Sequence, residues 1–284
     1  MEKVTIFEMG PRDGLQNEAA MISTADKIAL VDMLTAAGFQ KIEVTSFVSP
    51  KWVPQMADAH DVLTGIKRDS NVRYAALTPN IRGFDGAMAA QADEVAIFGS
   101  ASERFSQANI NCSIDESFER FSPIMVAAKS RVIPVRGYVS CVTDCPYDGP
   151  TDPAKVAYVA GRLMQMGCYE ISLGDTIGAG TPETIDSMLC AVLDEVSPTQ
   201  LSGHFHDTQA RALENIQVSL DHGLRVFDTA VGGLGGCPYA PGAKGNVATE
   251  AVSDLLLSLG FQTGLDTAKL QASADFAKGL RHDT

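Results

Sequence analysis

Eight short segments rich in β-branched and aromatic residues alternate with longer amphipathic segments, and this alternation limits the possible folds more than any other feature. The segments predicted as strands are 4–7, 41–45, 72–77, 94–98, 135–139, 170–173, 201–206 and 226–230. Regular alternation of strands with helices is typical of a parallel sheet whose faces are covered by helices. We therefore expect an α/β fold.

Helical segments lie between these strands and complete the pattern. Their apolar spacing predicts helices over 23–37, 85–91, 116–129, 153–166, 182–196, 210–221 and 246–259. Because no linker-like change of composition interrupts the alternation, it favours a (β/α)8 or TIM barrel over two domains or a doubly wound open sheet. We expect 1–284 to form one catalytic domain, with the barrel over about 1–260. The tail, 261–284, adds a helix over 267–279 that would lie across the barrel's open face.

The net charge limits the classes of molecule that this chain is expected to bind. With 22 Lys and Arg against 35 Asp and Glu, the formal charge is −13, which argues against a nucleic-acid or anionic-membrane surface. No apolar run approaches the roughly 20 residues that a membrane helix needs. The first ten residues lead straight into a strand without the pattern of a leader peptide, so we expect a cytoplasmic protein.

Six cysteines are spread thinly over the chain, which favours reduced thiols over a disulfide framework. Cys141 and Cys145 are separated by three residues and have no matching second pair, so a structural zinc site is disfavoured. Cys112, Cys168 and Cys190 are expected to be small buried hydrophobes.

Unusual polar residues fall after the predicted strands, where a TIM barrel builds its active site. His204 and His206 stand two apart in a strand and so project to the same side, where they can converge on a metal ion. Such a pair also arises by chance near a strand end. Asp13 and Asn246 would complete a nitrogen and oxygen donor set that suits Mg²⁺ or Mn²⁺ better than closed tetrahedral zinc, although Zn²⁺ or Co²⁺ stay open as alternatives.

Arg12 precedes Asp13 after the first strand. One interpretation is a structural ion pair with Glu43, near the end of the second strand. The other is stabilisation of negative charge on a substrate oxygen, which an always-charged guanidinium performs well. The two roles are compatible.

The segment 231–246 holds six glycines and two prolines, and it is typical of a mobile lid. It matches neither a phosphate-binding Walker loop nor a Rossmann fingerprint. Cys237 lies in its middle, where it is either reactive or incidental. Asn246 and Glu250, four apart at the predicted start of the next helix, would share one face.

Seven sequence blocks in order resemble the 3-hydroxy-3-methylglutaryl-CoA lyase family over nearly the whole chain. They lie at 10–18 (GPRDGLQNE), 43–56, 109–113, 136–141, 167–178, 204–208 (HFHDT) and 232–239 (GGLGGCPY). The resemblance implies a metal-dependent barrel that cleaves 3-hydroxy-3-methylglutaryl-CoA, an acyl-CoA thioester, to acetyl-CoA and acetoacetate. It also implies a homodimer.

The resemblance also implies roles for individual residues. Its metal ligands fall on Asp13, His204, His206 and Asn246, its charge-stabilising arginine on Arg12, and its lid cysteine on Cys237. Support of Arg12, proton transfer and orientation of the ligands would fall to Glu43, Asp175 and Glu250, respectively. Contacts with substrate or coenzyme A are expected from Arg12, Gln16, Asn109, Ser113 and Arg136.

Three positions depart from the animal enzymes. Phe205 replaces a smaller residue, Ala19 replaces a basic one, and the chain stops at Thr284 before their thiol-containing tail. Ala19 puts one substrate contact in doubt, and the three changes together resemble a bacterial, cytosolic form.

Retro-Claisen cleavage needs a base for the tertiary hydroxyl, and Asp175, His204 or a water are all candidates. Cys237 is suited to protonate the leaving enolate, because an apolar closed loop keeps a thiol protonated. The alternatives are a lyase for a related 3-hydroxyacyl-CoA, a condensing enzyme such as a 2-isopropylmalate or homocitrate synthase, and a catalytically inactive barrel that serves as a binding protein.

Overall fold

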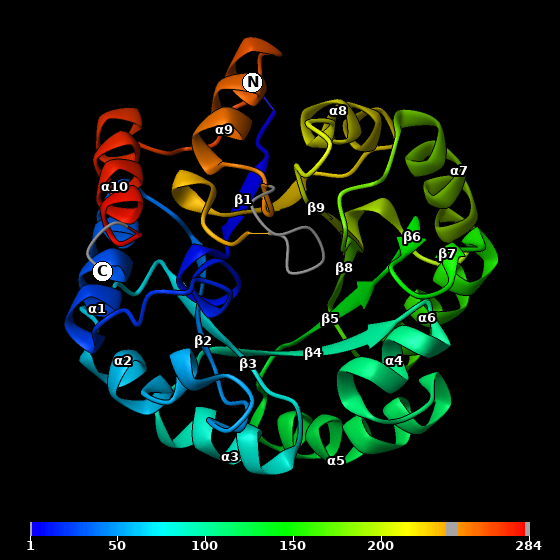
Figure 1. Ribbon diagram of the computed structural model, residues 1–284, viewed down its shortest axis with the longest axis horizontal. Coiled ribbons are helices and arrows are strands. Elements are labelled where there is room, and N and C mark those ends of the chain that lie inside the picture. The colour runs from blue at the N-terminus through cyan, green and yellow to red at the C-terminus, as the bar shows by residue number, and fades with distance from the viewer. Residues whose placement is uncertain (1, 237–243, 282–284) are drawn as a thin grey trace.

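Eight parallel strands close into a barrel in the computed structural model, which describes residues 2–236 and 244–281 (Figure 1). Around the ring the order is β1-β10-β9-β8-β5-β4-β3-β2, and β1 pairs with both β10 and β2. The strands are β1 (Thr5–Glu8), β2 (Lys41–Ser46), β3 (Arg73–Leu77), β4 (Glu94–Ser100), β5 (Val135–Ser140), β8 (Glu170–Asp175), β9 (Leu201–Phe205) and β10 (Val226–Thr229). The predicted TIM barrel is therefore confirmed, strand for strand.

Helices surround the barrel on all sides (Figure 1). They are α1 (Thr24–Ala37), α2 (Ala59–Gly65), α3 (Ile81–Ala89), α4 (Glu103–Ile110), α5 (Ile114–Arg131), α6 (Pro153–Met166), α7 (Pro182–Leu193), α8 (Ala212–Asp221), α9 (Thr249–Ser258) and α10 (Thr267–Gly279). The short helices α2 and α4 lie outside the predicted ranges. Helix α3 begins earlier than predicted because the Asn80 side chain accepts a hydrogen bond from Gly83 N at 3.0 Å and caps it.

Short elements shape the connecting loops. A hairpin of β6 (Asp144–Cys145) and β7 (Gly149–Pro150) follows β5, and a π-helical turn, η1 (Gly10–Gly14), follows β1. The remaining single turns are η2 (Pro54–Met56), η3 (Pro198–Gln200) and η4 (Val231–Gly233).

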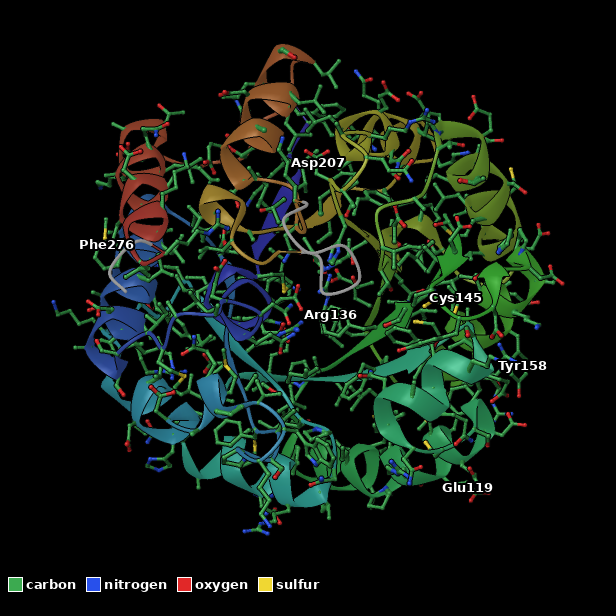
Figure 2. All side chains as sticks on the ribbon, in the orientation of Figure 1. Glu119, Arg136, Cys145, Tyr158, Asp207 and Phe276 are labelled. Atoms are coloured by element: carbon green, nitrogen blue, oxygen red, sulfur yellow. The ribbon has the colours of Figure 1, made fainter. Side chains whose placement is uncertain are left out.

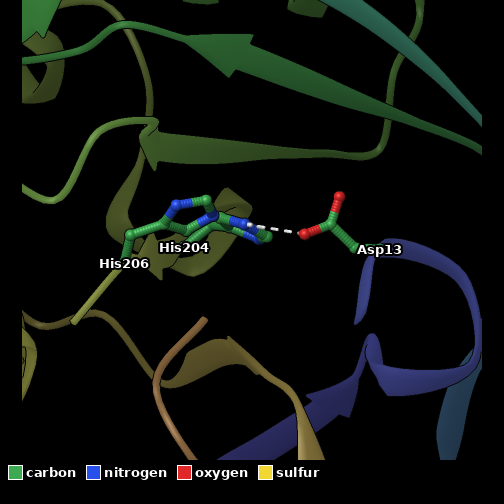
Figure 3. A group of neighbouring side chains, drawn as sticks. All are labelled: Asp13, His204 and His206. Atoms are coloured by element: carbon green, nitrogen blue, oxygen red, sulfur yellow. Dashed lines mark ion pairs between the residues drawn. The ribbon is translucent and has the colours of Figure 1, made fainter. Parts of the chain in front are cut away.

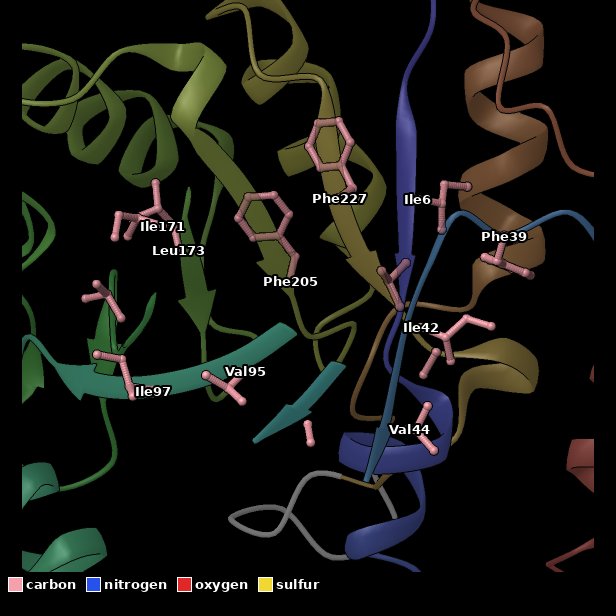
Figure 4. Close-up of a cluster of buried hydrophobic side chains, with 14 of the residues drawn as sticks. Ile6, Phe39, Ile42, Val44, Val95, Ile97, Ile171, Leu173, Phe205 and Phe227 are labelled. Carbon is pink, nitrogen blue, oxygen red and sulfur yellow. The ribbon is translucent and has the colours of Figure 1, made fainter. Parts of the chain in front are cut away.

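The main hydrophobic core lies between the barrel and its helices (Figure 4). Alternate strand residues such as Ile6, Ile171 and Phe227 point outward and pack there, since side chains alternate along a strand. Their neighbours point into the barrel. Toward the amino ends of the strands the interior holds charged side chains, and at the carboxyl ends it opens to the loops. Residues one position apart in a strand thus belong to different environments.

The sequence predicted that the C-terminal helix α10 lies across the open face of the barrel, and this prediction is wrong. It packs against α1, α9 and η4, and Figure 1 shows it in the outer ring beside α1. Its start is bonded to the end of α1 through Asp266 N and Ala37 O (2.9 Å), and its far end reaches the loop that precedes α1. Apolar side chains such as Leu270 and Ala274 face the core, so burial favours this position. None of the helices in the described residues is long and apolar enough to span a membrane.

Candidate active site

Asp13, His204 and His206 converge at the carboxyl ends of the barrel strands (Figure 3). One donor atom from each lies within 4.8 Å of the others, and His204 Nε2 is 3.8 Å from Asp13 Oδ2. The π-helical turn after β1 carries Asp13, while His204 lies near the end of β9 and His206 follows directly after it. Because Phe205 between them points outward into the core, its bulk leaves both imidazoles in place.

Asn246 lies beside this cluster, as predicted, but not on a helix. It pairs with His206 in an antiparallel bridge, and α9 begins only at Thr249. Its side-chain Nδ2 donates to Asp13 Oδ2 at 2.8 Å. A half-turn of the amide would present its oxygen instead, which makes Asn246 available as a neutral oxygen ligand.

The protonation of Asp13 and His206 suits a cation, whereas at His204 burial is outweighed by Asp228 and Asp13, which raise the pKa of the imidazole. Burial lowers the pKa of His206 to about 4, and its Nδ1 is buried without a partner in the described part of the chain. Burial alone would raise the pKa of Asp13, but Arg12 and the two histidines outweigh it and lower the pKa to about 2. A neutral imidazole and an ionised carboxylate are what a divalent metal needs as ligands.

Arg12 lies between two carboxylates on the cavity side of the cluster. Its Nε donates to Glu43 Oε2 at 2.6 Å and its Nη1 to Asp13 Oδ1 at 2.5 Å. The guanidinium also lies over the Tyr138 ring, 5.5 Å from the centroid. Burial opposes its charge, but the two carboxylates outweigh burial and raise its pKa. Arg12 is therefore a fixed positive charge, and Glu43 lies behind it as the expected support.

Asp228 is a part of the site that the sequence did not single out. Its Oδ2 is 3.2 Å from His204 Nδ1, and it accepts two hydrogen bonds from Arg136 and one from Ser172. Burial raises its pKa, but Arg136 outweighs burial and keeps the pKa low, so it is a carboxylate. A carboxylate on Nδ1 fixes the ring so that Nε2 faces Asp13. Because side chains alternate along a strand and Phe227 points outward, the sequence could have indicated that Asp228 points into the barrel.

Arg136 was expected to contact coenzyme A, but its side chain is buried inside the barrel. Its side chain is 0% exposed and forms ion pairs with Glu170 (2.7 Å) and Asp228 (2.7 Å) inside the barrel, near the axis in Figure 2. It lies near the start of β5, at the end of the barrel opposite the loops. This placement contradicts the expected contact, because a bound molecule cannot reach a side chain that is covered on all sides.

Asp175 also departs from expectation. Since Ser172 and Gly174 of β8 face the barrel interior, Asp175 points outward. It accepts hydrogen bonds from Gly180 N (2.9 Å), Ala179 N (3.2 Å) and Thr143 Oγ1 (3.1 Å). It therefore organises the loop after β8 and does not line the cavity, which weighs against its predicted role as a base.

A cavity of about 920 Å³ opens over the cluster. Its floor includes Arg12, Asp13 and both histidines, and its walls combine apolar rings such as Phe98 and Phe121 with polar groups. Gln16 and Asn109 line it, as expected for substrate contacts. Ser113 does not, because its side chain caps α5 by accepting from Glu116 N at 3.1 Å. Cys237 lies outside the described residues.

Carboxylates at the rim hold the described start of the glycine-rich segment. Glu250 accepts from Gly232 N (3.0 Å), so its observed contact is with this backbone and not with the metal cluster. Glu18 accepts from Gly235 N (2.9 Å) and from Arg281 Nε (3.0 Å) after α10. Gly235 has a positive φ of 88°, and a Cβ there would lie 3.1 Å from Asn246 Nδ2. Only glycine fits this close approach to the side chain of Asn246.

The sequence of this chain is similar to one protein family over almost its whole length. A family model described as HMGL-like matches residues 3–276. A mitochondrial hydroxymethylglutaryl-CoA lyase from Rattus norvegicus is 57% identical over 97% of this chain and 85% of its own length. The chain belongs to the HMG-CoA lyase family.

Bacterial members of the HMG-CoA lyase family agree. The crystal structure of the HMG-CoA lyase from Brucella melitensis superposes with a TM-score of 0.99 at 57% identity and covers both chains fully. A protein of Pseudomonas aeruginosa named 3-hydroxy-3-isohexenylglutaryl-CoA/hydroxy-methylglutaryl-CoA lyase is 58% identical over 93% of this chain and 88% of its own length. The predicted membership of this family is confirmed.

Proposed function

We propose that this chain cleaves 3-hydroxy-3-methylglutaryl-CoA to acetyl-CoA and acetoacetate. The observation that carries the proposal is the cluster of Asp13, His204 and His206 beside Arg12, on the floor of a cavity large enough for an acyl-CoA. Relatives with carbon-carbon lyase names match nearly the full chain, which supports the same reaction class.

The donor set of Asp13, His204, His206 and Asn246 fits a divalent cation. Two nitrogens with two oxygens, and no thiolate, favour Mg²⁺ or Mn²⁺. A cation held there would lower the pKa of the substrate hydroxyl and offset charge on its oxygen. The buried, unpartnered Nδ1 of a neutral His206 supports this assignment.

In the reaction, the tertiary hydroxyl loses a proton, the bond between C2 and C3 breaks, and acetoacetate leaves with the enolate of acetyl-CoA. The guanidinium of Arg12 stabilises the oxygen charge that develops. Of the three predicted bases, Asp175 points away from the cavity, and His204 has Nδ1 on Asp228 and Nε2 toward the proposed cation, so a water is favoured. We further propose that Cys237 gives the enolate carbon its proton.

The cavity is also compatible with a second substrate, one with a longer branch at C3. The Pseudomonas relative is also named for a substrate with a longer 3-isohexenyl branch. Apolar walls at Phe98, Phe121 and Leu77 would accept such a branch in this chain too.

A cytoplasmic location and a homodimer stay predictions from the sequence, as does the division into a barrel and a tail.

Product analysis tests the proposal. Purified protein, incubated with Mg²⁺ and 3-hydroxy-3-methylglutaryl-CoA, is expected to release acetyl-CoA and acetoacetate in equal amounts. The isohexenyl homologue, run in parallel, measures how far the branch is tolerated. Consumption of acetyl-CoA with a 2-oxo acid, and no cleavage, would instead favour the condensing alternative.

A further inference from the structure

A second group of metal-binding side chains lies on the outside of the barrel. Asp186 and Cys190 of α7 and His222, which follows α8, place one donor atom each within 4.8 Å of the others. His222 Nε2 is 2.8 Å from Asp186 Oδ1. Among the described residues this is the one such group besides the Asp13 cluster, and the proposed lyase activity gives it no role.

The three side chains stand on rigid elements. Asp186 and Cys190 are four apart in α7 and therefore share one face of the helix, a spacing by which helices present two ligands to one metal. His222 is the C-terminal cap of α8, where its backbone N donates to Val218 O at 3.1 Å. Helices α7 and α8 pack against each other, so the donors meet without rearrangement of the backbone.

Access and chemistry favour a zinc-like ion. Cys190 was expected to be buried, but it lies on the solvent side of α7 and is the exposed thiol among the described cysteines. Cys112, Cys141, Cys145 and Cys168 are buried. The Asp186 side chain is 60% exposed and that of His222 19%, so an ion can enter and keep a water. A thiolate with an imidazole and a carboxylate selects Zn²⁺ or Co²⁺ over Mg²⁺. The Asp13 cluster, which has no thiolate in its donor set, has the opposite preference.

We propose that Asp186, Cys190 and His222 form a surface site for Zn²⁺, with water as the fourth ligand. On binding, the Cys190 thiol gives its proton to solvent and its sulfur bonds to the metal. The ion joins α7 to α8, and because it binds the folded chain it raises the melting temperature. This inference does not depend on the lyase activity.

Cobalt titration tests the proposal, because Co²⁺ reports thiolate ligation by absorption. Metal-free wild type is expected to bind one more Co²⁺ per chain than Cys190→Ser and to show a thiolate-to-cobalt charge-transfer band that Cys190→Ser lacks. His222→Gln is expected to weaken binding at this site by more than about 100-fold, above the cost of losing an outer partner. Zn²⁺ is expected to raise the melting temperature of the wild type more than that of Cys190→Ser, which keeps only the Asp13 cluster.

Two controls locate the signal. His60→Gln removes an exposed histidine that pairs with Asp61 at 3.5 Å without a nearby thiol ligand, and it is expected to change nothing. Cys237→Ser is expected to keep the charge-transfer band. A band that persists in Cys190→Ser, or one that disappears only in Cys237→Ser, would overturn the proposal. Equal cobalt stoichiometry in the wild type, Cys190→Ser and His222→Gln would also overturn it.

Discussion

Arg12 combines two roles that the sequence left side by side. It is an ion-pair partner of Glu43 and Asp13, and its guanidinium lines the cavity. In the proposed reaction, its structural partners would hold it rigidly where negative charge develops on the substrate. Preorganised charge of this kind acts in the transition state more than in the ground state.

Arg12→Met is therefore expected to lower kcat by roughly 100-fold to 1,000-fold with a much smaller change in KM. Steady-state kinetics with the acyl-CoA substrate measure both constants. Arg131→Met is the matched control, since Arg131 forms an exposed ion pair with Asp85 on the outer surface. A loss of kcat no greater than in the control would remove Arg12 from the mechanism.

Asp228 acts on the site through His204. Because partners behind a metal-bound histidine commonly affect metal affinity by about 10-fold to 100-fold, Asp228→Asn is expected to weaken Mn²⁺ binding by that amount. It also deprives the buried Arg136 of a counter-charge, at a cost of about 3–5 kcal/mol in the free energy of unfolding.

The two effects of Asp228→Asn are separated by calorimetric Mn²⁺ titration of folded protein. Ser172→Ala is the control, because it removes one hydrogen bond to the same carboxylate oxygen and leaves both charges in place. Unchanged Mn²⁺ affinity in Asp228→Asn would contradict the positioning role.

At this scale, the sequence predicted the residues that sit on inward strand positions at the loop end. His204 and His206 follow from period-two alternation, and Asp13 from its place after β1. The same rule, applied to β8, would have turned Asp175 outward. Arg136 was misplaced because a sequence motif does not report depth along the barrel axis, and Asp228 escaped notice because a lone aspartate in a strand carries no motif.

At the scale of elements, α10 acts on the site from the outer ring. Arg281, just beyond it, donates to Glu18 and to Gly233 O, and Glu18 in turn holds Gly235 N. Lys278 pairs with Glu250, which holds Gly232 N. The end of the helix thus fixes the segment that packs against Asn246.

Arg281→Ala is expected to free this segment. Since the pair with Glu18 is partly exposed, the loss in unfolding free energy should be only ~1 kcal/mol. Hydrogen exchange at Gly233 and Gly235 should nevertheless accelerate strongly. Lys269→Ala, at an exposed pair on the same helix, is the control. Exchange at these glycines that matches the control would refute the link.

Glu8 joins the ends of two strands. Its carboxylate accepts from Gly10 N and Val231 N, both at 2.8 Å, and from Thr249 Oγ1 at 2.6 Å. Burial raises its pKa to about 7, despite these hydrogen bonds. A raised pKa in the folded state means that stability is greatest while the group is protonated and decreases as it ionises.

Glu8→Gln is expected to change how stability depends on pH. From pH 4.5 to pH 7 the wild type should lose up to ~3 kcal/mol relative to the variant, and the difference should level off above pH 7. Denaturant unfolding of both proteins across this range measures it. Glu2→Gln, exposed and outside the core, is the control. A constant difference between wild type and Glu8→Gln would contradict the assignment.

The elements themselves were largely legible from the sequence. All eight strands follow from their β-branched runs, and most helices from their apolar spacing. Helices α2 and α4 were not, because seven or eight residues give too few turns for a periodic signal. The place of α10 depends on packing with α1, which lies more than two hundred residues earlier in the chain.

At the scale of the whole molecule, the charge of −13 and the cavity act together. An acidic surface repels an anionic thioester, so binding must come from a few local positive groups at the cavity floor. In the proposed reaction, Arg12 and a cation held by Asp13, His204 and His206 would be such groups at the cavity floor. Cleavage is accordingly expected to depend on this cluster.

Metal depletion and restoration test that claim most directly. Wild-type protein treated with a chelator is expected to lose acetyl-CoA release and to regain it when Mg²⁺ or Mn²⁺ is added in excess. His206→Gln, still folded, should need far more metal for the same rate. Undiminished cleavage by chelated wild type, or an identical metal requirement in His206→Gln, would contradict the account.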